Sequence, residues 1–444
     1  MGGLGGGTPG LRPAAGGRRS VTQAATREAV TTVWRVESAR IVATLARLTG
    51  DLSLAEDLAQ DALVTALESW PRDGIPRQPK AWLLAVARRR GVDQIRRSAG
   101  LRRRLPQLAH DLEQNAMPEP TELVDHVEDD VLRLILLTCH PLLTPESRAA
   151  LTLRLVGGLT SAEIARALLV PEATMVRRIT RAKRTLADAG VTLELPAGQE
   201  RTDRLDDVLA VIYLIFNEGY AATQGDTWAR PDLCHEGVRL ARLLAGLVPD
   251  DPEVHGLQAL LELQASRLGA RTDAGGAPVL LDDQDRTRWD QLLIRRGLTA
   301  LRRAENLGTP VGGYTVQAEI AACHARATRP EDTDWARIAG LYDLLSGVAA
   351  NPVVEINRAV AHGRAHGPAA GLEVLAALAG DRVCTESAQY AAVHADLLAR
   401  DGRHRAAAGE FDRAAALTRN DRERQVLTAR ARAETARDDD PGPD

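Results

Sequence analysis

The chain has 444 residues, of which 44% are hydrophobic, 26% charged and 3% aromatic, a composition that allows about three domains built from packed helices rather than sheets. Residues 1–190 hold 27 Lys and Arg against 21 Asp and Glu, and residues 191–444 hold 29 against 39, so a basic front half precedes an acidic back half. This difference in charge between the two halves favours a nucleic-acid-binding part joined to another module. Because the chain lacks both an apolar run of about 18 residues and a signal-peptide core, we expect it neither to enter a membrane nor to be secreted.

The four cysteines are far apart and form no CxxC pair, which favours a reducing, cytoplasmic setting. Three of them precede a histidine, but adjacent residues at such wide intervals lack zinc-finger geometry. We therefore expect no metal site and no cofactor. The cysteines are Cys139, Cys234, Cys323 and Cys384.

Residues 1–25 are rich in glycine and predict a disordered lead. Three helices are expected after it, over residues 27–49, 54–70 and 80–97, with a Pro- and Gly-rich loop over residues 71–79. The polar side of the second helix carries Glu56, Asp57, Gln60 and Asp61.

The third helix places Trp82, Leu83 and Val86 inward and a dense arginine face outward. Arginines beside a core with two tryptophans fit a phosphate-binding surface, the alternative being a merely solvated charged helix. The outward arginines are Arg88, Arg89, Arg90, Arg96 and Arg97.

Residues 105–127 are acidic, contain proline and lack Lys and Arg, as expected of a solvated linker. Beyond it, residues 160–186 predict a helix-turn-helix. Thr160 and Glu163 have capping-box spacing, and Pro171 starts a second helix. That helix has one apolar side and one basic side, the layout of a recognition helix, although an ordinary helical hairpin with a charged face is the alternative. Its apolar side consists of Met175, Ile179, Ala182 and Leu186.

The segments AEDLAQDALVTALESW and QPKAWLLAVARRRGVDQIRR resemble the sigma-2 domain of the extracytoplasmic-function (ECF) sigma factors, and the helix-turn-helix resembles their sigma-4 domain. The order of the two modules and the linker between them agree as well, over roughly residues 27–190. The resemblance implies a sigma-2-like domain at residues 26–104 and a sigma-4-like domain at residues 128–190.

The same resemblance implies roles for individual residues. Asp57, Gln60 and Asp61 would face the clamp helices of core RNA polymerase. The loop from Asp73 to Gln78 would hold an unstacked base of the −10 element, with Trp82 and the arginines Arg88, Arg89, Arg90, Arg96 and Arg97 against the melted strand. Glu172, Ala173, Val176 and Arg177 would read −35 base edges, while Arg178, Arg181, Lys183 and Arg184 would hold phosphates.

Arg177 is the only one of these base readers with the donors for bidentate contact to guanine, so it is our main candidate for specificity. One departure from the family concerns the turn. Leu168-Leu169-Val170 stands where glycine is common, and Pro171 stands where a capping serine is common. The turn is compatible with a helix start, but base preference is open.

The acidic back half predicts a further helical domain over residues 191–333. It includes an apolar helix over residues 206–216 with Gly219 as its C-cap. Asn217, Glu218 and Tyr220 are residues of a kind that line a small-molecule pocket, but a packed helix terminus explains them as well. Asp282, Asp283 and Asp285 are explained better by helix capping than by a metal.

Residues 334–437 predict hairpins like those of tetratricopeptide repeats (TPR), which usually bind a protein or peptide. Trp335, Ile338, Ala339 and Tyr342 have the spacing of a first repeat helix. Ala407, Phe411 and Ala414 match a second helix, and Ala370, Val374 and Ala377 echo these three 37 positions earlier. An acidic tail follows at residues 438–444.

The back half also resembles the long C-terminal extension of one ECF subgroup, in which the extension governs activity. We thus expect an all-α sigma factor that binds core RNA polymerase and promoter DNA and is tuned by its extension. The alternative is a conventional helix-turn-helix regulator with a TPR-like sensor domain. The chain contains no Walker loop, GxSxG or HExxH motif, and we expect no enzyme activity.

Overall fold

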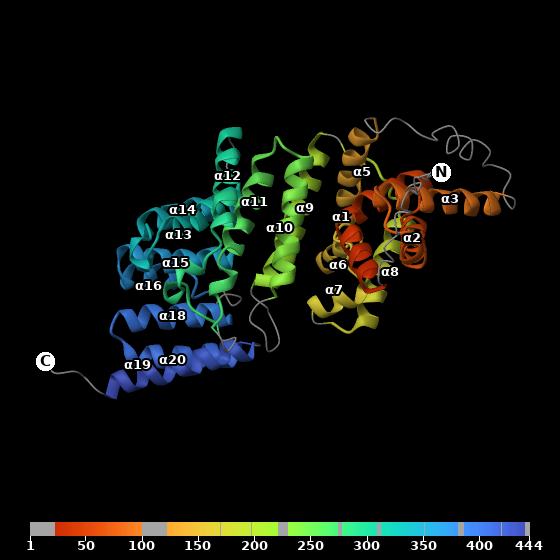
Figure 1. Ribbon diagram of the computed structural model, residues 1–444. Helices are drawn as coiled ribbons and strands as arrows, with labels where there is room; N and C mark the ends of the chain where they lie inside the picture. The colour runs from red at the N-terminus through yellow and green to blue at the C-terminus, as the bar shows by residue number, and fades with distance from the viewer. Residues whose placement is uncertain are drawn as a thin grey trace, which may run out of the picture. The chain divides into compact units, whose positions relative to one another are not determined.

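The computed structural model describes residues 23–99, 122–168, 170–196, 198–220, 230–273, 278–308, 312–349, 351–380, 386–418 and 420–439. Over these residues the chain is helical, with one isolated β-bridge between Thr272 and Pro278 and no strand, which confirms the all-α prediction (Figure 1). Within the described ranges no helix has the length and hydrophobicity that crossing a bilayer requires. The chain divides into two compact units, residues 1–131 and 132–444.

Several sequence predictions lie outside the described residues. These are the Gly-rich lead as far as residue 22, the linker as far as residue 121, Cys384 and the end of the acidic tail. The first described helix begins at Gln23, and the end of the predicted linker belongs to a helix that begins at Glu122.

The first unit is built on α1 (Gln23–Thr49), α2 (Leu52–Asp73) and α3 (Pro79–Ala99). Asp51 caps α2, because its side-chain oxygen accepts hydrogen bonds from the amides of Ser53 and Leu54 at 2.8 and 3.0 Å. The three helices enclose a core that includes Ile41, Leu45, Leu58, Trp70 and Leu83.

The predicted loop over residues 71–79 is too long. Helix α2 continues through Pro71 to Asp73, and the chain leaves the helix at Gly74, whose φ of 85° suits glycine. Pro71 lies in the last turn, so its missing N–H removes one backbone hydrogen bond only, and the helix ends two residues later. Asp73 is therefore the last helical residue and not a loop residue.

The second unit begins within α5 (Glu122–Thr138) and continues through α6 (Pro145–Leu155), α7 (Ser161–Ala167) and α8 (Glu172–Asp188). It then forms α9 (Gly198–Tyr220), α10 (Pro231–Leu247), α11 (Pro252–Ala265), α12 (Gln291–Leu307) and α13 (Gly313–Arg326), with short 3₁₀ turns between α11 and α12. The apolar helix expected over residues 206–216 is therefore longer at both ends.

Gly219 is not the C-cap of α9. It lies inside the helix, and a Cβ at this position would stand 2.7 Å from both the amide nitrogen of Cys234 and the Cβ of Leu233. Glycine is needed here because the end of α9 packs directly on the start of α10.

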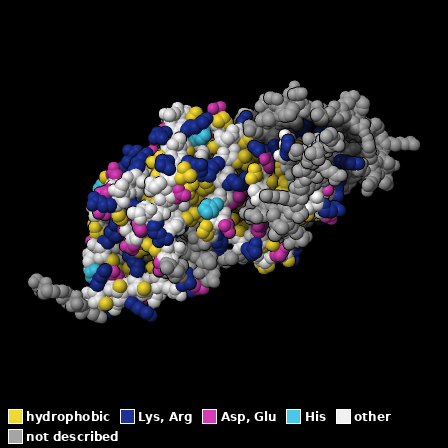
Figure 2. Space-filling view, in the orientation of Figure 1, with side chains coloured by type: hydrophobic (Ala, Val, Ile, Leu, Met, Phe, Trp, Pro, Cys, Tyr) yellow, Lys and Arg dark blue, Asp and Glu magenta, His cyan; other side chains and the backbone are white. Residues whose placement is uncertain are grey.

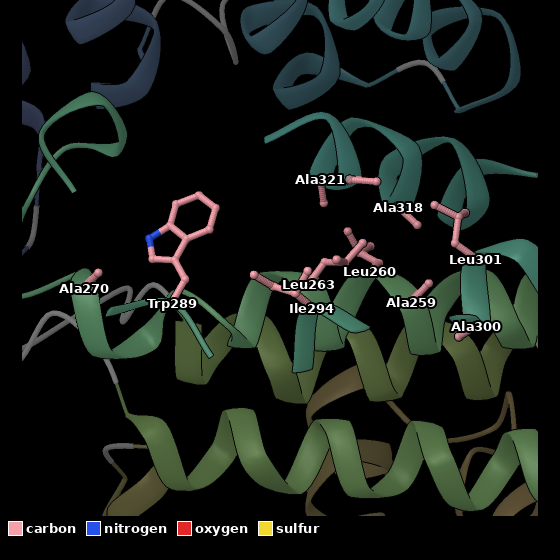
Figure 3. Close-up of a cluster of buried hydrophobic side chains, with 11 residues drawn as sticks. Ala259, Leu260, Leu263, Ala270, Trp289, Ile294, Ala300, Leu301, Ala318 and Ala321 are labelled. Carbon is pink, nitrogen blue, oxygen red and sulfur yellow. The ribbon is translucent and has the colours of Figure 1, made fainter. Parts of the chain in front are cut away.

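Helices α11, α12 and α13 share a buried apolar cluster (Figure 3). Leu260 and Leu263 project from α11 toward Ala318 and Ala321 of α13, while Leu301 of α12 closes one end. The abundance of alanine allows the helix backbones to come close together.

The remaining helices form successive hairpins: α14 (Trp335–Ala349), α15 (Pro352–His366), α16 (Pro368–Ala376), α18 (Ala388–Arg400), α19 (His404–Leu417) and α20 (Asp421–Asp439). In α19 the residues Ala407, Phe411 and Ala414 are buried, as their repeat-like spacing requires. The predicted match of Ala370, Val374 and Ala377 to this helix is weaker, because α16 ends at Ala376 and Ala377 is exposed. The assignment to TPR-like repeats stays a prediction.

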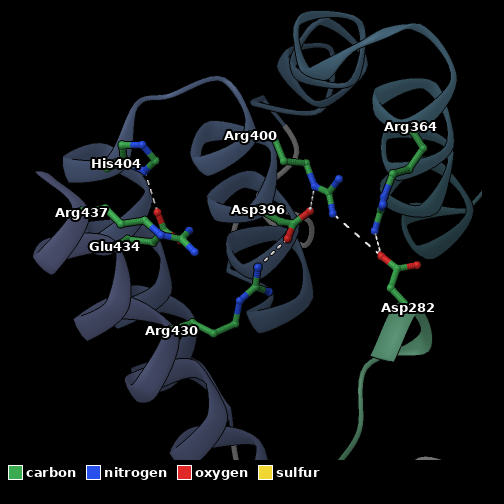
Figure 4. Close-up of polar contacts among 8 residues, drawn as sticks. All are labelled: Asp282, Arg364, Asp396, Arg400, His404, Arg430, Glu434 and Arg437. Atoms are coloured by element: carbon green, nitrogen blue, oxygen red, sulfur yellow. Dashed lines mark hydrogen bonds and ion pairs between the residues drawn. The ribbon is translucent and has the colours of Figure 1, made fainter. Parts of the chain in front are cut away.

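Ion pairs tie these hairpins together (Figure 4). Asp396 of α18 pairs with Arg400 at 2.7 Å and with Arg430 of α20 at 2.5 Å, and Glu434 pairs with His404 at 2.7 Å. Asp282 accepts from Arg364, so it fastens the segment before α12 to α15. On the face seen in Figure 2, acidic and basic side chains are intermingled over the helical extension.

The close packing of α11 on α13 yields a test of the fold. A Cβ at Gly256 would lie 2.3 Å from the Thr315 hydroxyl oxygen and 2.8 Å from the Thr315 amide nitrogen. Gly256→Ala should therefore destabilise the chain by about 1–3 kcal/mol, although alanine is the better helix former.

The matched control is Gly340→Ala in α14, where a Cβ would meet no atom within 4 Å. It should stabilise by about 0.5–1 kcal/mol. Thermal unfolding midpoints of the full chain check both changes, and equal shifts of the two variants would contradict the packing described.

Candidate nucleic-acid interface

Helix α8 presents two chemically distinct sides. Met175, Ile179, Ala182 and Leu186 are all buried, so the apolar side predicted from the spacing is confirmed. The preceding helix has the predicted capping box. The Thr160 hydroxyl oxygen accepts from the Glu163 amide at 3.1 Å, and Glu163 accepts from the Thr160 amide at 2.8 Å. Helix α8 begins at Glu172 with Pro171 as its N-cap, one residue later than expected.

The opposite side of α8 is open to solvent. Val176 is 45% exposed, and the remaining predicted contact residues divide into an exposed and a half-buried group. Half-buried Arg178 lies near Glu146 of α6. The pKa of Glu146 is lowered chiefly by a hydrogen bond to its own backbone amide, then by one to Thr144, with Arg178 a smaller cause. The exposed group is Glu172, Ala173, Arg177, Arg181 and Arg184, and Lys183 is half-buried.

Two of the exposed arginines have weak local partners. Arg177 donates to the Thr174 hydroxyl at 3.4 Å, and Arg184 pairs with Asp188 at 3.3 Å, with both side chains of that pair mostly exposed. Such contacts contribute little to stability in water, so these guanidinium groups remain available to an anionic ligand.

A second basic surface lies on α3 in the first unit. Trp70 is buried, and Trp82 is half-buried with its ring edge-on to Trp70 at 5.5 Å between centroids. Arg89 and Arg90 are exposed, and Arg88 is half-buried. Arg96 and Arg97 continue the helix, but their side chains lie outside the described residues. Asp73 and Gln78, at the two sides of the connection, are exposed.

The acidic side of α2 is partly engaged by this basic helix. Asp57 and Asp61 are exposed and Gln60 is half-buried, but Asp61 pairs with Arg90 at 3.1 Å. The two predicted surfaces therefore meet along α2 and α3, which the sequence pattern did not reveal. Glu56, expected on the polar side, is instead 5% exposed.

Helix ends of the helix-turn-helix region are capped by arginines from the following domain. Arg204 of α9 donates to the carbonyl oxygen of Leu136 in the last turn of α5 at 3.0 Å. Arg230, at the start of α10, donates to Ala167, the last residue of α7, at 2.7 Å, and Arg239 of α10 donates to Val156 at the end of α6 at 3.0 Å.

A half-buried ion pair joins α6 and α9. Arg148 of α6 and Asp207 of α9 approach to 2.5 Å, and Arg230 also pairs with Glu218 at 2.6 Å. Cations are favourable at the carbonyl ends of helices. The three arginine-to-carbonyl hydrogen bonds therefore satisfy carbonyl groups that a helix cannot pair by itself. No local sequence signal identifies the three arginine-to-carbonyl contacts or the Arg148–Asp207 pair, because their partners lie 59 to 83 positions apart. Glu218, by contrast, lies 12 positions from Arg230.

The described cysteines are buried, and burial raises the pKa of Cys139 to about 11 and of Cys234 to about 12. The pKa of Cys323 is raised by burial as well. A raised pKa disfavours the thiolate, so these cysteines behave as small apolar core residues. Across the described part of the chain no cluster of three His, Cys, Asp or Glu side chains is placed to hold a metal. Of the predicted capping residues, Asp285 caps the 3₁₀ turn at Thr287, Asp282 bonds to Arg364, and α12 is capped by Asp290 instead.

Three segments match known protein families. Residues 35–100 match Sigma-70 region 2, and residues 133–186 match Sigma-70, region 4. Residues 204–305 match a family of unknown function, DUF6596. The two basic helices thus belong to the two DNA-associated regions of a sigma-70-type transcription initiation protein.

Two similar proteins indicate which class of sigma-70-type protein the chain belongs to. The ECF RNA polymerase sigma factor SigL of Mycobacterium tuberculosis is 34% identical over 151 residues, which are 33% of this chain and 82% of SigL. The probable ECF RNA polymerase sigma factor SigI of the same organism is 30% identical over 174 residues, 39% of this chain and 59% of SigI. The chain belongs to the ECF RNA polymerase sigma factor family.

A relative that includes the extension is also found. An uncharacterized protein of Rhizobium meliloti is 45% identical over 382 residues, which cover 85% of this chain and 89% of that protein. No solved structure matches the chain.

Proposed function

We propose that the chain binds core RNA polymerase through α2, recognises the −35 element with α8 and the −10 element with α3, and initiates transcription. The observation that carries this proposal is the presence, in one chain, of an exposed arginine side on α8 and a second one on α3 beside a tryptophan pair. The first suits duplex DNA, and the second suits an unstacked strand.

Within α8, Arg177 is the proposed base reader, supported by its exposure and by its weak contact to Thr174. Glu172, Ala173 and Val176 lie on the same exposed side near the start of the helix, where a recognition helix meets base edges. Arg178, Arg181, Lys183 and Arg184 are the proposed phosphate contacts.

The alternative is a conventional helix-turn-helix regulator with a TPR-like sensor. A regulator of that kind needs no polymerase-binding helix and no melting surface. Promoter-specific RNA synthesis in a reaction with only core polymerase, DNA and this chain separates the two. Retained duplex binding without such synthesis would favour the regulator.

The assignment of α8 to the −35 element predicts that two arginine substitutions weaken DNA binding in different ways. Arg177→Ala should weaken binding to the −35 duplex by about 1–3 kcal/mol and relax the preference at one base pair. Arg181→Ala should weaken binding to all duplexes alike and reduce the salt dependence, because a phosphate contact carries no sequence information.

Arg181 is a cleaner choice than Arg184, whose removal would also leave Asp188 without its ion-pair partner. Duplex titrations at several salt concentrations, with single-base variants of the −35 element, measure both effects. Unchanged affinity of both variants would mean that the DNA surface lies elsewhere.

The polymerase assignment predicts that Asp61→Arg impairs binding to core polymerase and leaves isolated duplex binding intact, because an acidic contact becomes basic. A charge-reversed pair, Asp61→Arg with Arg90→Asp, restores the local ion pair between α2 and α3.

A core polymerase pull-down compares the two. If Asp61 contacts polymerase, the paired variant stays defective. Full recovery in the paired variant would instead assign Asp61 a purely structural role.

We further propose that the extension tunes activity by holding the helix-turn-helix region. Support comes from the three arginines that cap α5, α6 and α7 and from the Arg148–Asp207 pair. The TPR-like hairpins are the proposed surface for a protein or peptide partner.

Arg230→Ala tests this coupling. It removes a hydrogen bond to the last residue of α7 and leaves Glu218 without this ion-pair partner, so α7 should loosen by about 1–3 kcal/mol. Hydrogen exchange of α7 should rise, and −35 affinity and run-off transcription should change while core binding is retained.

The matched control is Arg405→Ala, an exposed arginine of α19. If Arg230→Ala gave the same duplex affinity and run-off yield as this control, the extension would not act through these contacts.

A further inference from the structure

A partly enclosed cavity of about 190 Å³ lies where α9 and α11 meet α13, α14 and α15. Its walls combine tyrosines, side-chain amides and a few aliphatic groups, and none of its described lining residues is charged. Asn217 and Tyr220, for which the sequence left open a pocket or a packed helix end, both line it.

The amide oxygens in this cavity are largely used by the protein itself. Tyr213 donates its hydroxyl hydrogen to the Gln317 Oε1 atom at 3.1 Å, and Arg267 donates to Gln264 Oε1 at 2.6 Å. Gln389 donates to Asn357 Oδ1 at 3.1 Å. Three of the four lining amides therefore have their acceptor atom occupied.

The hydrogen-bond donors are largely unused. The Gln264 and Asn357 amide nitrogens donate to no acceptor among the described residues, and Gln317 uses one of its two amide hydrogens, to Gly313. The Tyr220 hydroxyl accepts from Arg267, which leaves its own hydrogen free to be donated. Over the same described residues, the side chains of Tyr342 and Asn217 have no hydrogen-bond partner.

Two further features limit which ligands the cavity can hold. The rings of Phe216 and Tyr220 stack with centroids 5.5 Å apart. The guanidinium groups of Arg271 and Arg267 lie 3.5 and 5.8 Å from the Tyr220 ring centroid, so positive charge is near the cavity although its lining residues are uncharged. A cavity of about 150 Å³ holds benzene, so this one has room for a single small ring with polar substituents.

We propose that this cavity binds a small uncharged ring compound bearing carbonyl acceptors, of the class of cyclic imides, lactones and oxo-pyrimidines. Amide and hydroxyl donors that line the cavity without a protein acceptor among the described residues can donate to the carbonyl oxygens of such a ring. The apolar side chains Leu260, Leu261 and Ile320 contact the ring edge. This binding does not depend on the proposed transcription function.

The test uses the full chain and ligand-observed NMR with calorimetry. The probes are uracil, succinimide and γ-butyrolactone, which carry carbonyl acceptors, and pyrrole and benzene, which do not. At least one carbonyl ring should bind about tenfold or more tightly than pyrrole and benzene. If no carbonyl ring binds, or if benzene or pyrrole binds equally well, the proposal is overturned.

Two variants locate the binding. Tyr342→Phe removes one donor and keeps the ring, so it should weaken the tightest carbonyl probe by about two- to tenfold without loss of folding. Asn217→Leu should weaken it similarly, and the control Gln291→Leu, at the exposed start of α12, should not. Unchanged affinity in both cavity variants would place the probe elsewhere and refute the assignment.

Discussion

The capping of helix ends by arginines from a neighbouring domain is the interaction on which the arrangement of the second unit depends. Helices α5, α6 and α7 each end with carbonyl groups that the helix itself cannot satisfy. Arg204, Arg230 and Arg239 supply the missing donors from α9 and the start of α10. Because these guanidinium groups are partly removed from water, their hydrogen bonds are stronger than those of exposed arginines. The helix-turn-helix region and the helices matching DUF6596 are therefore one packed body, not two domains on a tether.

The arginine caps do not involve the exposed arginines of α8. The extension contacts the ends of α5, α6 and α7, while Arg177, Arg181 and Arg184 on α8 stay exposed. Among the described residues, these contacts of the extension therefore lie at α5, α6 and α7 and not at the exposed arginines of α8. The proposed tuning would therefore work through the contacts at the ends of α5, α6 and α7 and not by covering the arginines of α8.

Local patterns in the sequence predicted those parts of the fold that are determined locally. The spacing of Met175, Ile179, Ala182 and Leu186 identified the buried side of α8, and the Thr160–Glu163 box marked the start of α7. Features set by distant contacts were missed. Gly219 has no positive φ and is required only because α10 packs on it, and the Asp61–Arg90 pair depends on how α3 lies on α2. For the cavity, the sequence offered Asn217 and Tyr220 as possible pocket residues, but the rest of the lining comes from five helices and could not be predicted.

Helix α9 connects the arginine caps of the helix-turn-helix region with the cavity. Its first half carries Arg204 and Asp207, which hold α5 and α6, and its second half carries Tyr213, Asn217 and Tyr220, which line the cavity. A ring bound in the cavity contacts the same rigid helix that caps the helix-turn-helix region. Occupancy alone does not alter that region, because a ligand shifts an equilibrium only as far as it binds two states differently. Any coupling therefore requires that α9 have two positions and that the cavity donors meet a carbonyl in only one of them.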